Sequence, residues 1–194
     1  MRDEPNKFGK DFYQQPIFEL AQHLLGKRIV HRPRSGIITA VEIYYGEEDQ
    51  ACHARFGKTQ RNAVMYGPPG YTYIYLCYGL HYLLNIVAEK EGFPAAILIR
   101  GMLPEERERA WSKQFSPRLE LGPGSLTKFL KLTKVDSGRC LYQDRSLYLT
   151  PGIPIPSTWI QRGPRIGVDY AGEWAKKPWR WFVAPDFFNR LGGN

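Results

Sequence analysis

The chain has 194 residues, with 27 lysines and arginines against 19 aspartates and glutamates, and a formal net charge of +8. This length predicts one domain, 1–194, that can bury its core without disulfides. The charge favours a polyanion such as nucleic acid as the partner, because neutralised phosphates release condensed counterions. Three cysteines without CxxC spacing argue against a disulfide framework and a zinc site.

The sequence also indicates where the protein works. Its first residues, MRDEP, contain no apolar segment of the kind that secretory signals carry, and no stretch is long and apolar enough to span a bilayer. We therefore expect an intracellular monomer, in the cytoplasm, nucleoid or nucleus, that makes no membrane contact.

The first predicted elements are a helix and a strand. Apolar residues recur at helical spacing over 16–27, with Pro16 near the start and Gly26 as the C-cap. The β-branched and aromatic run 36–45 predicts a strand. A polar loop of mixed charge follows over 47–62 and leads into the turn 67–70.

A β-hairpin is predicted next. Strands over 71–78 and 82–87 lie on either side of Gly79, and a third strand covers 95–100. Pro104 opens a charged helical stretch to about residue 115, with Glu105 and Glu106 in its first turn. Ser125 is expected to cap a short helix, and a last strand covers 179–183. Because short turns separate the strands, we predict an α+β fold: a curved, mostly antiparallel sheet with a protruding hairpin and flanking helices.

Glu42 is an anomaly in the strand 36–45. Period-two alternation puts Ile38, Ala40 and Tyr44 on the same face as this carboxylate. A lone strand glutamate is usually solvated, but the alternative is a side chain aimed into a site. Tyr44 beside it, and His53 after the loop, favour a site that combines an acid, an aromatic ring and an imidazole.

The hairpin carries a second set of candidates. Tyr71, Tyr73 and Tyr75 alternate onto one face, and Tyr78 stands at the tip against Gly79. A bulky tip residue suits a wedge that enters a duplex, although a hairpin packed on its own domain is the alternative. In the second strand the polar Asn85 is either a core amide with its hydrogen bonds satisfied or a residue that reads a ligand.

Taken together, these segments resemble the 3-methyladenine (alkyladenine) DNA glycosylases, over nearly the whole chain from the first helix onward. The matching motifs are Glu42-x-Tyr44 with His53 eleven residues after the glutamate, Arg61-Asn62, Tyr75-x-x-Tyr78-Gly79, Asn85, Arg100, Arg165-Ile-Gly-Val and the segment 171–178.

The resemblance implies a role for each matching residue. Glu42 would activate the attacking water as a general base, and Arg100 would position both. The base pocket would comprise Tyr44, His53, Tyr75 and Asn85, with Asn85 excluding normal guanine. Tyr78 would fill the gap left by the flipped nucleotide. We list as candidate DNA-backbone contacts Leu80, His81, Arg61, Arg165, Lys176 and Lys177.

The expected reaction is base-excision repair: release of an alkylated or deaminated purine from damaged double-stranded DNA. An alkylated purine is cationic and a good leaving group, so one carboxylate that delivers water suffices. The strands that carry the motifs contain no lysine for a Schiff base, and Lys58 lies in the polar loop. We therefore expect a monofunctional hydrolase without cofactor, and the four histidines lack metal-ligand spacing.

Two other function classes stay open at this stage. A non-enzymatic DNA- or RNA-binding module would explain the charge and the tyrosines but leaves Glu42 unexplained. A hydrolase of nucleosides or small glycosides would use Glu42 but gives no reason for the charge or for Tyr78.

Overall fold

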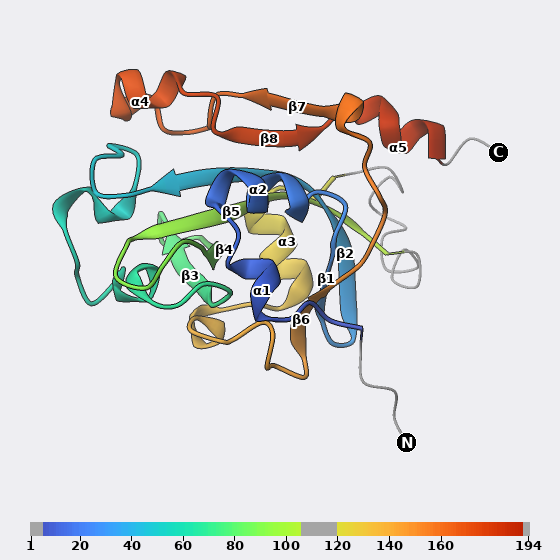
Figure 1. Cartoon of the computed structure of the whole chain (residues 1–194), viewed down its shortest axis with the longest axis horizontal. Coiled ribbons are helices and arrows are strands. Elements are labelled where there is room, and N and C mark those ends of the chain that lie inside the picture. Colours follow the sequence, from blue (N-terminus) through green and yellow to red (C-terminus); the bar gives the residue numbers. More distant parts are fainter. Residues whose placement is uncertain (1–5, 106–119, 192–194) are drawn as a thin grey trace.

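The computed structural model describes residues 6–105 and 120–191. Its centre is an eight-stranded sheet in which every pairing is antiparallel (Figure 1). The strands are β1 (Arg28–His31), β2 (Arg34–Tyr45), β3 (Thr72–Cys77), β4 (His81–Val87), β5 (Ala95–Pro104), β6 (Leu147–Thr150), β7 (Ile160–Gly163) and β8 (Arg180–Val183). The order is β3-β4-β5-β2-β1-β6, with β8 also on β2 and β7 on β8. This confirms the predicted α+β class and antiparallel sheet.

Short helices flank the sheet. They are α1 (Lys10–Tyr13), α2 (Ile17–Leu24), α3 (Pro123–Leu130), α4 (Glu173–Lys176) and α5 (Pro185–Leu191). The predicted first helix is confirmed as α2, which follows Pro16 and ends before Gly26, whose φ of +79° suits glycine. Two 3₁₀ turns, η1 (His53–Phe56) and η2 (Ala63–Tyr66), lie in the long connection between β2 and β3.

The two faces of the sheet are buried by different elements. One face forms the main core with α2 and α3, through residues such as Leu20, Ile43, Ile97 and Leu126. The other face packs against η1 and η2 in a smaller cluster that includes Tyr73. Because both faces are covered, a polar side chain in the central strands must find its partners inside the protein.

A β-bulge corrects the predicted alternation in β2. Ile38 pairs with Met102 and Val41 with Ile99, so the register shifts on both sides of Ala40. Ile38 therefore lies in the main core together with Val41. Glu42 points to the opposite face, so its predicted sharing of a face with Ile38 is wrong.

Two further boundaries differ from the prediction. Pro104 ends β5, which runs past Arg100, and Glu105 bonds to Ser35 and Arg28 instead of opening a helix. The rest of the predicted charged helix lies outside the described residues. Ser125 is inside α3, whose N-cap is Gly122, because Pro123 already has the φ that the first helical position requires.

Candidate active site

One row of paired residues crosses the sheet and sets the geometry of the site. Tyr73 pairs with Asn85, Asn85 with Leu98, Leu98 with Glu42, and Glu42 with Arg180. Residues in register on neighbouring strands point to the same face, about 5 Å apart per strand. The register thus brings residues far apart in the sequence to the face that η1 covers.

Glu42 is fully buried in the middle of this face. Its Oε1 accepts a hydrogen bond from the Ile166 N–H at 2.9 Å, and its Oε2 accepts one from the Tyr44 hydroxyl at 3.2 Å. The Arg100 Nε lies 3.4 Å from Oε1. The carboxylate is therefore held by three neighbours from three separate segments.

Burial raises the pKa of Glu42 above its ordinary value. The hydrogen bond from Ile166, the charge of Arg100 and the hydrogen bond from Tyr44 each lower the pKa and oppose that effect. A carboxylate of raised pKa binds a proton more readily than a solvated one, which is the property that a general base requires.

A cluster of aromatic groups lies on the same face of the sheet as this carboxylate. The His53 Nδ1 is 2.9 Å from the Tyr73 hydroxyl, and the His53 ring meets the Tyr75 ring edge-on with centroids 4.4 Å apart. Burial, with the charges of Arg61 and Arg55, lowers the pKa of His53 to about 4. The imidazole is therefore neutral near pH 7 and offers a flat polar edge without charge.

The loop that carries His53 is fixed from within. The buried Asn62 donates through Nδ2 to the His53 and Gly57 carbonyls, both at 3.0 Å, and its Oδ1 accepts from the Thr59 N–H. Arg61 next to it is exposed, with its guanidinium 5.6 Å from the centre of the Tyr75 ring. Arg61 thus lies at the rim of the site.

Asn85 is buried in β4 on the same face. Its Nδ2 donates to the Tyr73 carbonyl at 3.0 Å and to the Leu83 carbonyl at 3.4 Å. These contacts orient the amide in the row that leads to Glu42.

The tip of the β3–β4 hairpin is exposed and conformationally strained. Tyr78 is 88% exposed and Leu80 75% exposed, and His81 beside them is exposed too. Tyr78 has a φ of +49° and Gly79 one of +70°. Left-handed backbone costs a non-glycine residue roughly 1 kcal/mol, so a large aromatic residue there is held out at an energetic cost.

Arg165 corrects the list of candidate DNA contacts. Its side chain is fully buried and pairs with the equally buried Asp49, at 2.6 and 2.8 Å. The guanidinium also donates to the Ile43 and Trp174 carbonyls and lies 4.9 Å from the centre of the Tyr44 ring. It therefore cannot reach a phosphate in this arrangement, and its geometry is that of a structural support.

The remaining predicted contacts lie apart from Glu42. The exposed Lys176 pairs with Glu173. Lys177 lies 3.5 Å from the centre of the Trp174 ring and lines a pocket of about 660 Å³ that also contains Trp179 and Tyr45. Tyr45 is the neighbour of Tyr44 in β2, so this pocket is on the other face of the sheet.

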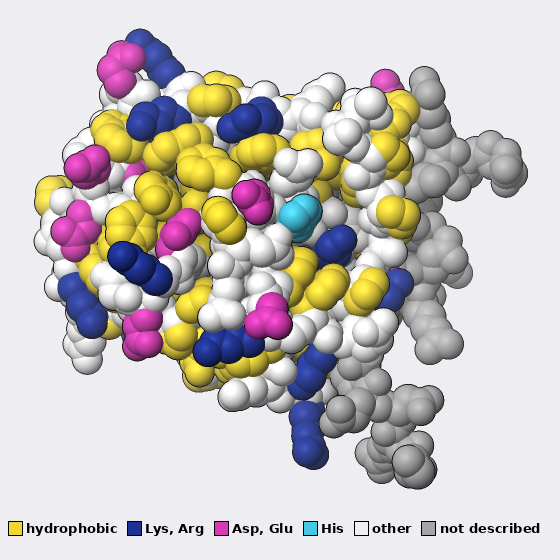
Figure 2. All heavy atoms as spheres, viewed as in Figure 1, with side chains coloured by type: hydrophobic (Ala, Val, Ile, Leu, Met, Phe, Trp, Pro, Cys, Tyr) yellow, Lys and Arg dark blue, Asp and Glu magenta, His cyan; other side chains and the backbone are white. Residues whose placement is uncertain are grey.

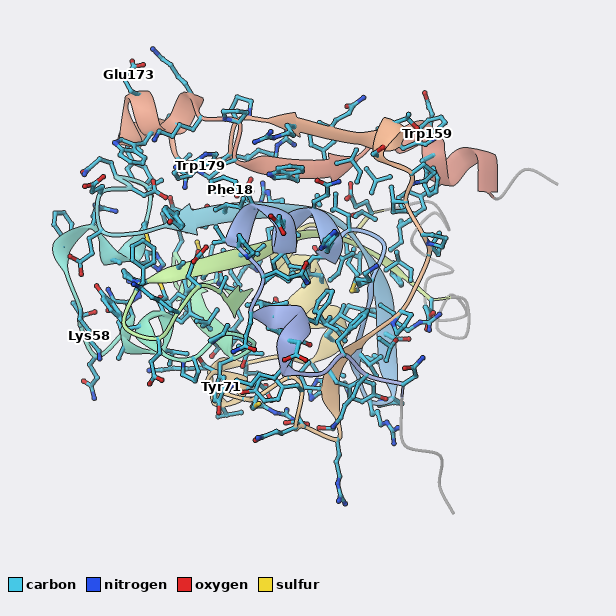
Figure 3. The ribbon with its side chains drawn as sticks, viewed as in Figure 1. Phe18, Lys58, Tyr71, Trp159, Glu173 and Trp179 are labelled. Atoms are coloured by element: carbon cyan, nitrogen blue, oxygen red, sulfur yellow. The ribbon has the colours of Figure 1, made fainter. Side chains whose placement is uncertain are left out.

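Figures 2 and 3 show that other face, which carries α2. Phe18 and Trp179 lie side by side there, with ring centroids 5.8 Å apart (Figure 3). The described residues on this face mix apolar side chains, carboxylates and cations without forming a continuous basic band (Figure 2). Lys58 extends outward from its loop (Figure 3), and its Nζ lies 5.4 Å from the centre of the Tyr66 ring.

Sequence reasoning missed two residues that hold the site together, Ile166 and Asp49. Ile166 acts through its backbone N–H, so its side chain gives no signal. Asp49 follows two glutamates in a charged loop and looks like a solvated residue. The motif Arg165-Ile-Gly-Val contains Ile166 itself and the partner of Asp49, but the nature of these contacts becomes visible in the fold alone.

Within residues 6–105 and 120–191, His, Cys, Asp and Glu side chains form no group of three or more that could hold a metal ion. Over the same residues, none of the helices has the length and apolar character needed to cross a bilayer.

The comparisons with known proteins all indicate the same family. The model of the methylpurine-DNA glycosylase family matches residues 11–186. A protein of Methanocella arvoryzae is 42% identical over 183 residues, which cover 89% of this chain and 90% of its own. Proteins of Myxococcus xanthus and Chlorobaculum tepidum are also 42% identical, over 92% of this chain and 90% and 88% of theirs. All three carry the name "Putative 3-methyladenine DNA glycosylase".

Proposed function

The chain belongs to the methylpurine-DNA glycosylase family, and we propose that it flips a damaged purine out of duplex DNA and hydrolyses its N-glycosidic bond with water activated by Glu42. As a family member it is a DNA glycosylase, a hydrolase of DNA repair. The observation that carries the proposal is a fully buried carboxylate held by Ile166, Tyr44 and Arg100. Burying this charge costs free energy, and a role in catalysis accounts for that cost.

The proposed reaction needs one base and no acid when the lesion is a cationic alkylated purine. Water attacks C1′ of the deoxyribose and gives its proton to the Glu42 carboxylate. The C1′–N bond breaks, its electrons go to the purine, and the base leaves neutral. Arg100, beside Glu42 Oε1, holds the carboxylate for the attacking water.

The neighbouring aromatic residues supply the proposed base pocket. Tyr44, His53 and Tyr75 would stack on the extruded purine, and a cationic base gains on the order of 1 kcal/mol or more from each favourable ring contact. The neutral His53 avoids repelling that cation. Tyr78, exposed and held out at the hairpin tip, would take the place of the flipped base in the stack. Leu80, His81 and Arg61 stay the proposed contacts around this wedge.

Release of free base tests the proposal directly. The protein should release methylated purine from alkylated duplex DNA in the presence of a chelator, and borohydride should trap no covalent protein–DNA adduct. Trapping of an adduct, above all through Lys58, would contradict the monofunctional mechanism. Absence of any base release from alkylated duplex would contradict the function itself.

A second expectation concerns the pH dependence of excision. The ionised form of Glu42 is the active base, so the rate should rise with pH through the raised pKa of Glu42. The Tyr44 hydroxyl donates to Glu42 and lowers that pKa. Tyr44→Phe keeps the stacking ring but removes the hydroxyl that donates to Glu42. The acid limb of the plot of single-turnover rate against pH should therefore move to higher pH.

Tyr66→Phe is the matched control for this shift. Its hydroxyl donates to the Glu47 carboxylate at 2.6 Å instead of to Glu42. The control should leave the acid limb in place. An unshifted limb in Tyr44→Phe would mean that a group other than Glu42 controls it. Because the pKa of His53 is about 4, this residue should add no further limb between pH 5 and 8.

A third expectation concerns base selection by Asn85. Its amide is fixed by the Tyr73 and Leu83 carbonyls, so it presents a rigid obstacle in the row that leads to Glu42. Asn85→Ser removes bulk and should raise the excision of guanine lesions relative to adenine lesions. Parallel measurements on 7-methylguanine and 3-methyladenine duplexes check this, and an unchanged ratio would make Asn85 a structural residue.

A further inference from the structure

A second pocket, of about 290 Å³, lies beside the tip of the hairpin. It is lined by Leu80, His81, Tyr82, Gly124, Thr127, Lys128, Lys131, Leu132 and Thr133. The lining contains two lysines and no carboxylate. Lys128 and Lys131 are exposed, and no described carboxylate forms an ion pair with either. The pocket therefore presents uncompensated positive charge.

The fold holds this pocket in a fixed shape. The Thr127 hydroxyl donates to the Tyr82 carbonyl at 2.6 Å and thereby ties α3 to β4. Gly124 lets the His81 ring approach closely, because a Cβ there would lie 2.8 Å from the His81 Cγ. Lys131 ends α3 in left-handed backbone with a φ of +55°. The lysines thus stand three residues apart on one side of a helix that is anchored to the hairpin.

The pocket and the candidate active site lie on opposite faces of the same hairpin. Tyr73 and Asn85 point to the face of Glu42. Tyr82 and Leu84 alternate with Leu83 and Asn85, so they point to the face that α3 covers. Figure 1 shows α3 beside β4. Leu80, at the exposed tip, belongs to the wall of the pocket.

We propose that this pocket binds a backbone phosphate of the undamaged DNA strand, with Lys128 and Lys131 supplying the charge. The inference rests on the proposed function. In the proposed complex, the hairpin enters the duplex beside the lesion with one DNA strand on each of its faces. The flipped nucleotide belongs to the strand on the Glu42 face, so the strand that meets α3 is its complement. A phosphate near the tip then lies next to the two lysines.

The first test compares two double variants with the same loss of charge. K128A/K131A removes both pocket lysines, whereas K10A/K90A removes two exposed lysines, one in α1 and one at the far end of β4 from the tip. Affinity of K128A/K131A for a lesion duplex should fall on the order of tenfold, and its slope of log affinity against log salt should become shallower by about one. Affinity and slope equal to those of K10A/K90A would overturn the site.

The second test assigns the strand. A methylphosphonate replaces a charged phosphate by a neutral one, and it is placed near the lesion in either strand. In the undamaged strand it should weaken binding of wild type and K10A/K90A but cause no further loss in K128A/K131A. In the damaged strand it should weaken all three proteins alike. If the methylphosphonate causes no further loss of binding in K128A/K131A only when it lies in the damaged strand, the assignment of the phosphate to the undamaged strand is wrong.

The two proposals fail in different ways. Release of methylated purine by the wild-type protein tests the glycosylase proposal and does not depend on the pocket. Base release by the wild type together with unaltered DNA binding of K128A/K131A would overturn the pocket alone. Thermal melting of both double variants shows whether the fold is intact, because all four side chains are exposed.

Discussion

Glu42→Gln should lower single-turnover base release by roughly 10²-fold or more, the scale typical of losing a general base. The amide keeps the size of the side chain, and its oxygen still accepts the Ile166 N–H. What is lost is the basicity that, in the proposed mechanism, takes the proton of water. Single-turnover rates at saturating enzyme isolate this step from product release.

Folding and binding should behave differently from catalysis in this variant. Burial raises the pKa of Glu42, so the ionised carboxylate destabilises the folded state at neutral pH. Removing the charge should therefore leave the melting temperature equal or higher, and affinity for lesion duplex equal or tighter.

Glu48→Gln, the same chemical change at an exposed loop residue, is the matched control and should excise at the wild-type rate. If Glu42→Gln melts and binds normally but excises within a few-fold of wild type, the assignment of the base is wrong.

Local patterns in the sequence were enough to predict the central part of the fold. Helical spacing predicted α2, the β-branched and aromatic run predicted most of β2, and Gly79 between two strand patterns predicted the hairpin. Each of these patterns depends on residues that are close together in the sequence. The short strands β1, β6 and β7 have four residues each and are formed by pairing with distant partners, so no local pattern predicted them.

The candidate site likewise combines features that the local sequence predicts with features that depend on distant pairing. The sequence placed Glu42 beside Tyr44, and the resemblance added Arg100, which does lie against the Glu42 carboxylate. The bulge at Ala40 could not be predicted, because it arises from the pairing of β2 with β5. This bulge reverses the alternation, so Ile38 faces the core while Glu42 faces the site.

Arg165 shows why charge alone does not identify a DNA contact. As one of many cations in a basic chain it looked like a phosphate ligand. The burial of Arg165 depends on a carboxylate 116 positions away, Asp49, which no local pattern connects to it.

Asp49→Asn should be the most destabilising of the variants considered, by about 3–5 kcal/mol, because it leaves a buried guanidinium without its counter-charge. The Asp49 carboxylate accepts two hydrogen bonds from Arg165 and further ones from the Ala51 and Tyr45 N–H groups. An amide in its place can satisfy part of this set but presents an NH₂ toward the remaining donors. Urea unfolding, with the slope checked for two-state behaviour, measures the loss.

The control is an exposed pair in the same part of the chain. Glu173→Gln breaks the contact with Lys176, in which both side chains are more than 70% exposed. This variant should change the free energy of unfolding by no more than about 0.5 kcal/mol, because solvent screens the pair. The contrast separates the effect of burial from the effect of removing an acid.

Destabilisation by Asp49→Asn should also reach the Glu42 carboxylate through the chain. Arg165 precedes Ile166, whose N–H holds Glu42 Oε1, and Arg165 donates to the carbonyl of Ile43, which follows Glu42. Loosening the buried Arg165–Asp49 pair therefore releases the backbone on both sides of the Glu42 carboxylate. At a temperature where the variant is folded, excision should fall while Glu173→Gln excises normally. If the free energy of unfolding of Asp49→Asn lies within 1 kcal/mol of wild type, the buried pair does not hold the segment that positions Glu42.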